Sequence, residues 1–337
     1  MKQEFVALIL AAGKGTRFKS DTIKLLHPLL GKSMIRLIVE TLVSLEPAAV
    51  GLVVGHQKEA LLAESFSSEV FFAEQMEQRG TAHAVLAASD VLKKFSEKSV
   101  LVMNGDLPLV RPETLRPFLK EHFSTGNDLT FLTADLDNPF GFGRLVHEED
   151  GSVRIVEEKD ATPEQKKIKE SNLGVYLFRI DRMLEMLPRI GNDNAKGEYY
   201  LTDSIALYFK NGLSCGAFKT PNKDEFVGVN DRIELARAAG VLRDRKLEGL
   251  MKDGVSFCDP DSVWVDVDVQ IGRDSVISAS VVIEGGTAMG ENCRIGPFSH
   301  ISNCRIGSHV VVEGSCVLKS CVIGDGEKIF SFERREN

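Results

Sequence analysis

The sequence lacks the features that would direct it to a membrane or to nucleic acid. No apolar segment approaches the roughly 20 residues that a membrane-spanning helix needs. The N-terminal run Phe5–Ala12 is preceded by Glu4 and leads directly into a glycine-rich turn, so we interpret it as a buried strand and not as a signal peptide. Excess positive charge is also absent, because the formal net charge is −8. We therefore expect no nucleic-acid partner and no membrane partner.

Cysteine is sparse and shows no paired spacing. The chain has six cysteines and no CxxC pair, and at 337 residues it needs no disulfide staples. The sequence thus predicts reduced, buried thiols in a cytoplasmic protein. Cys304 and Cys321 lie 17 positions apart and are expected to stack as small interior residues of the C-terminal repeat. A metal site there is disfavoured, because no histidine or acidic residue shares their spacing.

Length and composition favour a globular chain of about two domains. Hydrophobic residues make up 43% of the sequence and charged residues 27%, as is typical of well-packed proteins. We predict a first domain over residues 1–230, a linker helix over 231–254 and a second domain over 255–337.

Residues 1 to about 230 alternate short apolar runs with segments of helical periodicity. The first four runs are almost continuously apolar, as expected for strands of a sheet that is covered on both faces. Repeated strand–helix–strand units imply a parallel sheet with right-handed crossovers, which is a Rossmann-like α/β domain. The predicted strands are Phe5–Ala12, Ala49–Gly55, Val70–Ala73, Ser99–Asn104, Asp128–Ala134 and Leu173–Phe178, and the predicted helices are Ser33–Leu45, Lys58–Phe66, Thr81–Leu92 and Pro112–Phe123.

Two further elements are predicted from local signals. The segments Gly143–His147 and Val153–Val156 flank Asp150-Gly151, which indicates a β-hairpin. The helical pattern of Arg232–Met251 is suited to linking the two domains.

A six-residue period replaces these patterns in the last part of the chain. Aliphatic residues recur at every sixth position from Val265 to Ile323, with two five-residue steps, and glycine follows several of them. This period fits neither a helix nor a β-sandwich and is typical of a parallel β-helix whose aliphatic side chains point inward. Eleven such positions, at three per coil, predict between three and four coils. The repeat is expected to fade at Ile323 into a charged, aperiodic tail over residues 328–337.

The strongest local motif follows the first predicted strand. The segment Leu10-Ala11-Ala12-Gly13-Lys14-Gly15-Thr16-Arg17, with Lys24 beyond it, places glycines and cations where the chain must reverse. Glycine lets the backbone approach a phosphate, and free N–H groups with nearby cations can neutralise a triphosphate. The motif lacks the third glycine of the GxGxxG fingerprint, and Gly31-Lys32-Ser33 is no Walker loop, because Leu26 stands in place of its first glycine. A plain tight turn remains the alternative.

Several further motifs, in the same order along the chain, resemble those of a known family. They are Gln75 with Gly80–Ala84, Gly105–Leu109, Gly141–Arg144, Val156–Ala161, Asn172, Gly197–Asp203 and Gly228–Asn230. Together with the glycine-rich motif they resemble nucleotidyltransferases of the glycosyltransferase-A-like fold. The closer resemblance is to the N-acetylglucosamine-1-phosphate uridyltransferase half of the bifunctional bacterial enzyme that also acetylates glucosamine-1-phosphate. This resemblance covers residues 1 to about 325 and implies a nucleotidyltransferase domain followed by a short left-handed parallel β-helix.

The resemblance also implies a role for each site residue. Arg17, Lys24 and Asp106 would be catalytic, and Asp106 and Asn230 would bind Mg²⁺, the expected cofactor. The amide of Gln75 can both donate to and accept from a base edge, which favours uracil. The nucleotide, UTP, would contact Leu10, Ala11, Ala12, Gly13, Gly15, Lys24, Gln75, Gly80 and Thr81. The sugar-1-phosphate would contact Asn104, Gly105, Gly143, Glu157, Asn172 and Asn230.

The implied reaction transfers a uridylyl group from UTP to N-acetylglucosamine-1-phosphate and releases pyrophosphate. The phosphate oxygen of the sugar attacks the α-phosphorus in line, and because it is already ionised at pH 7, no protein nucleophile or general base is needed. Acetyltransferase activity is not expected, unless the chain is a fragment of a longer protein, because the family places those residues on later coils and a C-terminal arm.

Two alternatives stay open. The first is another triphosphate and sugar-phosphate pair, because Asn104 occupies a position near the sugar that is tyrosine in some members of the family. The second is a non-catalytic paralogue that assembles through its β-helix. The resemblance also implies self-association, because members of the family form homotrimers through the β-helix.

Overall fold

The structure, a computed structural model, describes residues 4–13, 15–55, 58–66 and 68–336. Lys14 of the glycine-rich motif lies outside the described residues. The chain divides into two compact units: the first comprises Met1–His27 and Met34–Asp231, and the second comprises Pro28–Ser33 and Arg232–Asn337. Among the described residues, no helix is both long and apolar enough to cross a membrane.

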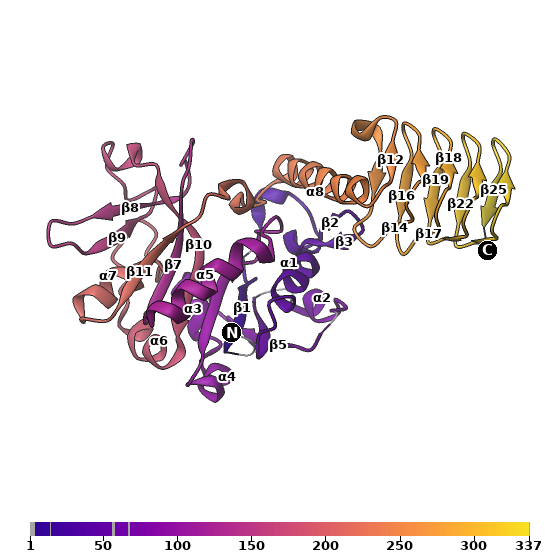
Figure 1. Cartoon of the computed structure of the whole chain (residues 1–337). Helices are drawn as coiled ribbons and strands as arrows, with labels where there is room; N and C mark the ends of the chain where they lie inside the picture. Colours follow the sequence, from indigo (N-terminus) through magenta and orange to yellow (C-terminus); the bar gives the residue numbers. More distant parts are fainter. Residues whose placement is uncertain (1–3, 14, 56–57, 67, 337) are drawn as a thin grey trace. The chain divides into compact units, whose positions relative to one another are not determined.

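The first unit is built on a nine-stranded sheet (Figure 1). Its main path is ordered β11-β7-β10-β6-β1-β4-β5, and the hairpin β8–β9 is attached to β10. The strands are β1 (Phe5–Leu10), β4 (Ala49–Val54), β5 (Val70–Glu74), β6 (Ser99–Asn104), β7 (Leu129–Asp135), β8 (Gly143–His147), β9 (Val153–Val156), β10 (Glu170–Arg179) and β11 (Cys215–Lys219). The helices are α1 (Met34–Val43), α2 (Lys58–Leu62), α3 (Thr81–Leu86), α4 (Ser89–Leu92), α5 (Pro112–Thr125), α6 (Ile180–Met186) and α7 (Asp203–Lys210).

The prediction of a parallel sheet is wrong at β10. Strand β1 is parallel to β4 and β6, and β4 is parallel to β5, as expected. Strand β10 instead runs antiparallel to both β6 and β7. Its chain direction is reversed because the connection from β7 contains the β8–β9 hairpin and no crossover helix. Strand β11, which the sequence patterns did not reveal, adds a parallel neighbour to β7.

Both faces of this sheet are covered, as the apolar runs predict. On β1, Val6 and Leu8 belong to a cluster that also contains residues of α3, α6 and α7. The alternate residues Phe5, Ala7 and Ile9 point to the other face and are equally buried. The predicted helix over Thr81–Leu92 is broken into α3 and α4, since Ala88 leaves the helical region with φ −90° and ψ 1°.

The second unit is a left-handed parallel β-helix preceded by the long helix α8 (Arg232–Lys252). Short strands stack in three parallel sheets of five, five and four members. The first sheet is β12 (Ser256–Phe257), β15 (Val276–Ile277), β18 (Arg294–Ile295), β21 (Val311–Val312) and β24 (Lys328–Ile329). The second is β13 (Trp264–Val265), β16 (Val282–Glu284), β19 (His300–Ser302), β22 (Val317–Lys319) and β25 (Arg334–Glu336), and the third is β14 (Gln270–Ile271), β17 (Ala288–Met289), β20 (Arg305–Ile306) and β23 (Val322–Ile323).

The predicted inward positions form three buried stacks. Ile277, Ile295 and Val312 stack in the first sheet and continue to Ile329, which is fully buried. The aperiodic tail is therefore a wrong prediction: β24 and β25 extend the prism into a fifth coil. The repeat is hidden there because Arg335 pairs with Leu318 at the next inward register position and forms ion pairs with Glu327 and Glu333.

The cysteines are only partly as predicted. Cys304 and Cys321 stack inside the β-helix with their sulfur atoms 3.5 Å apart. All six thiols are free. However, Cys258 is exposed and Cys215 is half-buried, because the first follows an edge strand and the second begins strand β11.

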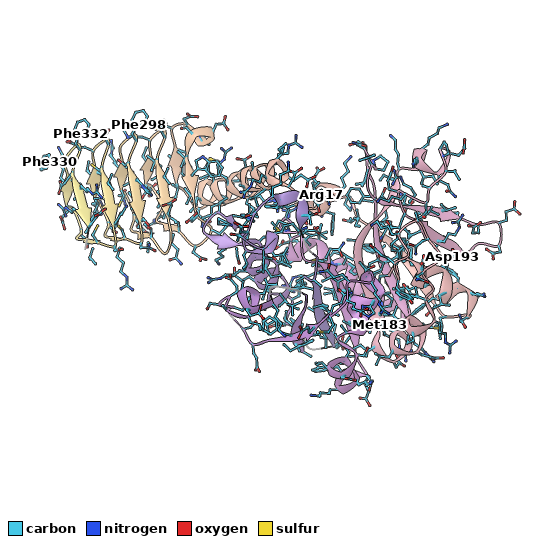
Figure 2. The ribbon with its side chains drawn as sticks, turned by 180° about the vertical axis from the view of Figure 1, so that it is seen from behind. Arg17, Met183, Asp193, Phe298, Phe330 and Phe332 are labelled. Carbon is cyan, nitrogen blue, oxygen red and sulfur yellow. The ribbon has the colours of Figure 1, made fainter. Side chains whose placement is uncertain are left out.

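The corners of the β-helix use left-handed backbone conformations. One corner carries Ser280, Phe298, Ser315 and Phe332, all with φ between 57° and 66°. Its two phenylalanines are 69% and 82% exposed, and Phe330 nearby is 61% exposed. Figure 2 shows Phe298, Phe330 and Phe332 projecting from the same edge of the prism. This edge is therefore unusually apolar for a solvent-facing surface.

The hairpin of strands β2 (Pro28–Leu29) and β3 (Lys32–Ser33) belongs to the second unit, although it lies between residues of the first along the chain. The backbone N–H of Val267 donates to the carbonyl of Leu30 at 3.1 Å. The Lys32 ammonium lies 2.6 Å from a carboxylate oxygen of Asp268. Gly31 has φ +82°, and a β-carbon there would lie 2.5 Å from a carboxylate oxygen of Asp266. Nothing in the sequence patterns indicated this attachment.

Candidate active site

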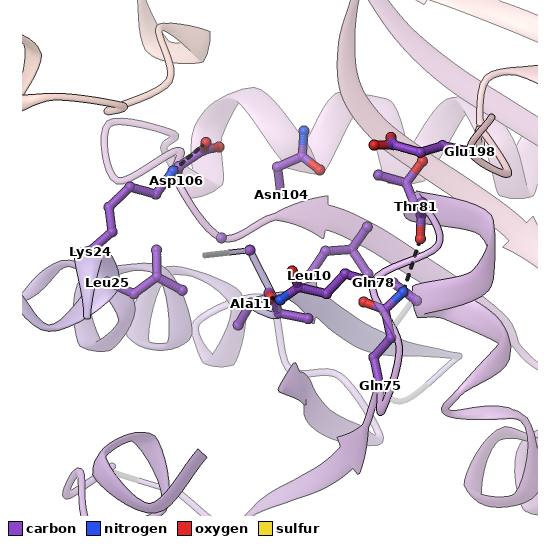
Figure 3. A pocket seen from close by; sticks show the side chains of 15 residues that line it. Leu10, Ala11, Lys24, Leu25, Gln75, Gln78, Thr81, Asn104, Asp106 and Glu198 are labelled. Carbon is purple, nitrogen blue, oxygen red and sulfur yellow. Dashed lines mark hydrogen bonds and ion pairs between the residues drawn. The ribbon is translucent and has the colours of Figure 1, made fainter. Parts of the chain in front are cut away.

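A cleft of about 400 Å³ opens in the first unit where β1 and β6 end (Figure 3). The carboxyl ends of parallel strands are where open α/β sheets bind ligands. Leu10 ends β1 and Asn104 ends β6, and the two residues pair across the sheet. The segments that follow the two strands, Ala11–Gly13 and Gly105-Asp106, continue the cleft lining.

The glycines of these segments permit close backbone approach. The N–H of Gly105 donates to the carbonyl of Leu10 at 3.0 Å, and a β-carbon at Gly105 would lie 2.9 Å from the same oxygen. Gly13 has open space where a β-carbon would stand. Gly15 has φ +58°, and a β-carbon there would lie 2.9 Å from that of Lys24. The loop thus needs glycine for its turn and leaves room over Gly13 for a ligand.

Two cations and two oxygen-bearing side chains meet at one end of the cleft. Lys24, in the short 3₁₀ helix Lys24–Leu26, donates to Asp106 Oδ2 at 2.9 Å and to Asn230 Oδ1 at 3.4 Å. Arg17 donates to the same Asn230 oxygen at 2.9 Å. The backbone also ties these segments together, since the N–H of Val229 donates to the carbonyl of Asp106 at 2.9 Å. The structure therefore brings together four residues that are up to 213 positions apart.

The other end of the cleft carries amides. Gln75 is only 4% exposed, and its Nε2 lies 3.1 Å from the Gly80 carbonyl oxygen and 3.1 Å from His83 Nδ1. Gln78 donates its side-chain N–H to the carbonyl of Ala12. Thr81 Oγ1 accepts from the N–H of Leu201 at 2.9 Å, which attaches the start of α3 to the segment before α7. These contacts hold the wall of the cleft without any side-chain charge.

Three of the six residues expected at the sugar, Gly143, Glu157 and Asn172, form a separate group outside the cleft lining. Gly143 on β8 pairs with Asn172 on β10. A β-carbon at Gly143 would lie 3.5 Å from Glu157 Oε1, so this carboxylate lies against the same glycine. Asn172 donates to the Tyr176 hydroxyl at 2.6 Å, while its Oδ1 is buried and has no hydrogen-bond partner among the described residues. The group therefore presents a buried acceptor that no described protein donor satisfies.

A bulge in β10 connects this group to the cleft. The register of β10 against β7 shifts between Asn172 and Tyr176. Gly174, inside the bulge, has φ +71°, and a β-carbon there would lie 2.5 Å from Asn104 Nδ2. Only glycine therefore fits where β10 passes Asn104.

Burial disfavours negative charge around Glu157. Burial raises the pKa of the Glu157 carboxyl, although a hydrogen bond from Thr202 at 3.1 Å opposes this effect. Burial, followed by repulsion from Glu157 and Asp160, raises the pKa of Asp203 to about 6. Glu157 and Asp203 therefore both keep their protons to a higher pH than exposed carboxyl groups do.

The cleft is lined by eleven of the residues that the sequence predicted. They are Leu10, Ala11, Ala12, Gly13, Lys24, Gln75, Gly80, Thr81, Asn104, Gly105 and Asp106. Arg17 and Asn230 join it through their hydrogen bonds, and Gly15 through its approach to Lys24. Gly143, Glu157 and Asn172 do not line it.

Sequence reasoning missed several cleft residues. Gln78, Glu198, Leu25 and Ala84 also line it. Glu198 lies in the Gly197–Asp203 motif, so its position was signalled although its role was not. Gln78 had no signal beyond its nearness to Gln75. Among the described residues, no group of three or more His, Cys, Asp or Glu side chains could hold a metal ion.

Two family profiles match the chain. The profile of the nucleotidyl transferase family matches residues 6–268. The bacterial transferase hexapeptide profile, with six repeats, matches residues 268–303 and 286–320.

Curated relatives carry the printed name "Bifunctional protein GlmU". The protein of Lactobacillus johnsonii is 45% identical over 309 residues, which cover 91% of this chain and 67% of the relative. That of Caldanaerobacter subterraneus is 43% identical over 331 residues, covering 98% of this chain and 71% of the relative. That of Syntrophotalea carbinolica is 44% identical over 316 residues, covering 94% and 68%.

Proposed function

The chain belongs to the nucleotidyl transferase family, and we propose that it transfers a uridylyl group from UTP to N-acetylglucosamine-1-phosphate, releasing pyrophosphate. The observation that carries this proposal is the convergence of Arg17, Lys24, Asp106 and Asn230 beside a glycine-lined cleft. Such a site can hold a triphosphate by its charge and a base by its uncharged amide end. The GlmU relatives support the choice of substrates.

The residues of the chain divide the work of the reaction between them. Arg17 and Lys24 neutralise the triphosphate and stabilise the pyrophosphate as it leaves. Glu157 and the unsatisfied Oδ1 of Asn172 accept hydrogen bonds from the acceptor sugar, and so hold its phosphate for in-line attack on the α-phosphorus. The chain supplies no nucleophile, because the attacking phosphate oxygen is already ionised.

We propose Mg²⁺ as the cofactor, held by Asp106 and Asn230. The fit is supported by the Lys24 ammonium, a cation on which the carboxylate oxygen and the amide oxygen already converge. Two protein oxygens suit Mg²⁺, which completes its coordination with water and substrate phosphates. When bound, the ion neutralises charge on the phosphate oxygens.

Self-association as a homotrimer through the β-helix is part of the proposal. It is supported by the hexapeptide match and by the exposed phenylalanine edge at Phe298, Phe330 and Phe332. A cytoplasmic location is also proposed, on the basis of six free thiols.

The decisive experiment measures pyrophosphate release over a panel of nucleoside triphosphates and sugar-1-phosphates, with and without Mg²⁺. We expect UTP with N-acetylglucosamine-1-phosphate to give the highest kcat/KM, and chelation of Mg²⁺ to abolish turnover. Asn104 makes a different acceptor the second candidate, because this residue lines the cleft and also lies against Gly174 in the bulge of β10. Release with no pair at all would contradict the proposed function. Acetyl transfer to glucosamine-1-phosphate, assayed in parallel, tests the expectation that this activity is lacking.

A further inference from the structure

Gln75 is fixed by two hydrogen-bond acceptors. Its backbone N–H donates to the carbonyl of Val54 at 2.8 Å, and its side chain is nearly inaccessible to solvent. Its Nε2 lies 3.1 Å from the Gly80 carbonyl oxygen and 3.1 Å from Nδ1 of His83. Figure 3 shows Gln75 at the same end of the cleft as Thr81, away from Lys24 and Asp106.

The chemistry of these partners determines the orientation of the amide. A carbonyl oxygen can only accept, so the Gln75 atom facing Gly80 must be the nitrogen. That nitrogen carries two hydrogens, and the second points to His83 Nδ1, which therefore accepts and leaves the ring proton on Nε2. Both donors of the amide are thus used within the protein.

The remaining atom of the amide is available to a ligand. Within the part of the chain that the structure describes, no donor reaches Gln75 Oε1. Gln75 consequently offers the cleft an acceptor only, which revises the expectation that its amide both donates and accepts. Uracil presents a donor at N3, where cytosine presents an acceptor, so an acceptor-only amide discriminates between the two bases.

We propose that His83 is a positioning residue that selects uracil by occupying the second hydrogen of the Gln75 amide. This inference rests on the proposed function, since it concerns the base of the same nucleotide. Helix α3 holds the ring in place: the N–H of Ala82 donates to the carbonyl of Tyr199 at 2.9 Å, and that of Ala84 to the carbonyl of Gly80 at 3.1 Å. Without His83, the Gly80 carbonyl is the one partner left to the amide, so the whole side-chain amide can rotate, and an N–H that faces the cleft could donate to N3 of cytosine.

The test measures kcat/KM for UTP and for CTP in the same preparation of each variant, so that any unfolded fraction cancels from the ratio. His83→Leu removes the acceptor, and we expect the UTP/CTP ratio to fall about tenfold, mainly through KM. His83→Asn places an oxygen near the position of Nδ1, and we expect it to retain the ratio of the unchanged protein. His83→Ala removes the same acceptor with less bulk and serves if the leucine variant does not fold.

Two results would overturn the proposal: an unchanged ratio in His83→Leu or His83→Ala, or an equal loss in His83→Asn. A general packing defect would lower both kcat/KM values together and leave their ratio alone. If the unchanged protein does not use UTP, the proposed function itself fails, and that failure is seen before any variant is compared.

Discussion

The Lys24 ammonium connects the two side chains that we propose as metal ligands. It contacts Asp106 and Asn230, and its own side chain is only 13% exposed. Such a partly buried ion pair holds both oxygens in place before any substrate arrives. If Mg²⁺ bound Asp106 and Asn230, the Lys24 ammonium would be displaced from the carboxylate and could pair with the phosphates of the nucleotide instead.

Asp106 is the residue whose removal should matter most for turnover. We expect Asp106→Ala to lower kcat by about 10³-fold with Mg²⁺ present, because the charge that balances the metal is lost. Stability should change little, since the side chain is partly exposed and lies at a strand end. The matched control is Asp137→Ala, which removes an 86% exposed carboxylate paired with Lys223. Near-normal turnover in Asp106→Ala, measured by pyrophosphate release, would refute the assignment.

His122 should make the protein sensitive to acid. It is 2% exposed and lies between the hydroxyls of Ser99 and Thr130, at 3.0 and 2.9 Å. Burial lowers its pKa to about 4 from the ordinary 6.5. The unfolded chain therefore binds a proton at His122 more readily than the folded chain does. The contribution of neutral, buried His122 to the free energy of unfolding is complete above about pH 6.5 and is lost as the pH falls towards 4. The free energy involved is up to about 3 kcal/mol.

The measurement is the free energy of unfolding in urea at pH 7.5 and at pH 5 for the unchanged protein and for His122→Gln. Glutamine can still bond to both hydroxyls but does not titrate. We expect the variant to lose less stability between the two pH values. Equal losses would show that His122 does not carry the acid sensitivity.

At the residue scale, the sequence was a better guide to which residues belong to the cleft than to which side chains contact one another. Leu10 and Asp106 could be predicted as cleft residues because Leu10 ends β1 and Asp106 lies two residues beyond the end of β6. Lys24 could be predicted because it is a cation that follows the glycine-rich motif. The bond from Thr202 to Glu157 and the pairing of Gln75 with His83 could not. They depend on how α7 and α3 approach the sheet, which local patterns do not contain.

Among the elements, β10 is the one that shapes the site most. Its bulge at Gly174 is the point at which the sheet approaches Asn104. We expect Gly174→Ala to lower stability by about 2 kcal/mol and to raise the KM for the sugar phosphate, because the new methyl group displaces Asn104.

Gly126→Ala is the matched control for this change. Gly126 ends α5 with φ +67°, close to the +71° of Gly174, but a β-carbon there meets no atom within 4 Å. Gly126→Ala should therefore introduce backbone strain without a steric clash. We expect it to lower the free energy of unfolding by about 1 kcal/mol and to leave the KM for the sugar phosphate unchanged. Thermal unfolding and steady-state kinetics compare the two variants. Equal effects on KM would exclude a specific role of the bulge.

Strands were more predictable than their pairing directions. Continuous apolar runs located β1, β4, β5 and β6, since burial on both faces leaves this trace in composition. The reversal of β10 left no trace, because an apolar strand looks the same in either direction. The last coil was missed for a different reason: Arg335 stands at the inward register position that pairs with Leu318, so Ile329 is the one aliphatic residue that continues the repeat there.

For the whole molecule, the phenylalanine edge of the β-helix predicts a change in assembly. Phe298 and Phe332 occupy left-handed corners that asparagine tolerates better. We expect the double change Phe298→Asn and Phe332→Asn to weaken the proposed trimer, because it removes two exposed apolar side chains from the edge. The free energy of unfolding of the single chain should stay unchanged or rise by about 1 kcal/mol, because asparagine relieves the strain at the two corners.

Sedimentation velocity over a range of concentrations measures the assembly. Val322→Thr is the control, because Val322 is a 71% exposed apolar residue on another sheet of the prism. It should leave the assembly intact. A trimer that survives the double change at low concentration would show that this edge is not the contact.

The hairpin Pro28–Ser33 has consequences for co-translational folding and for proteolytic cleavage of the chain. Its partners around Val267 and Asp268 are synthesised more than 200 residues later, a delay of at least about 10 s at the fastest usual rate of translation. During that time the nascent hairpin has nothing to pack on. In the finished protein the backbone passes between the two units three times. A protease that cleaves the chain after Asp231 should therefore leave two fragments that stay associated through the contacts of this hairpin with Val267 and Asp268.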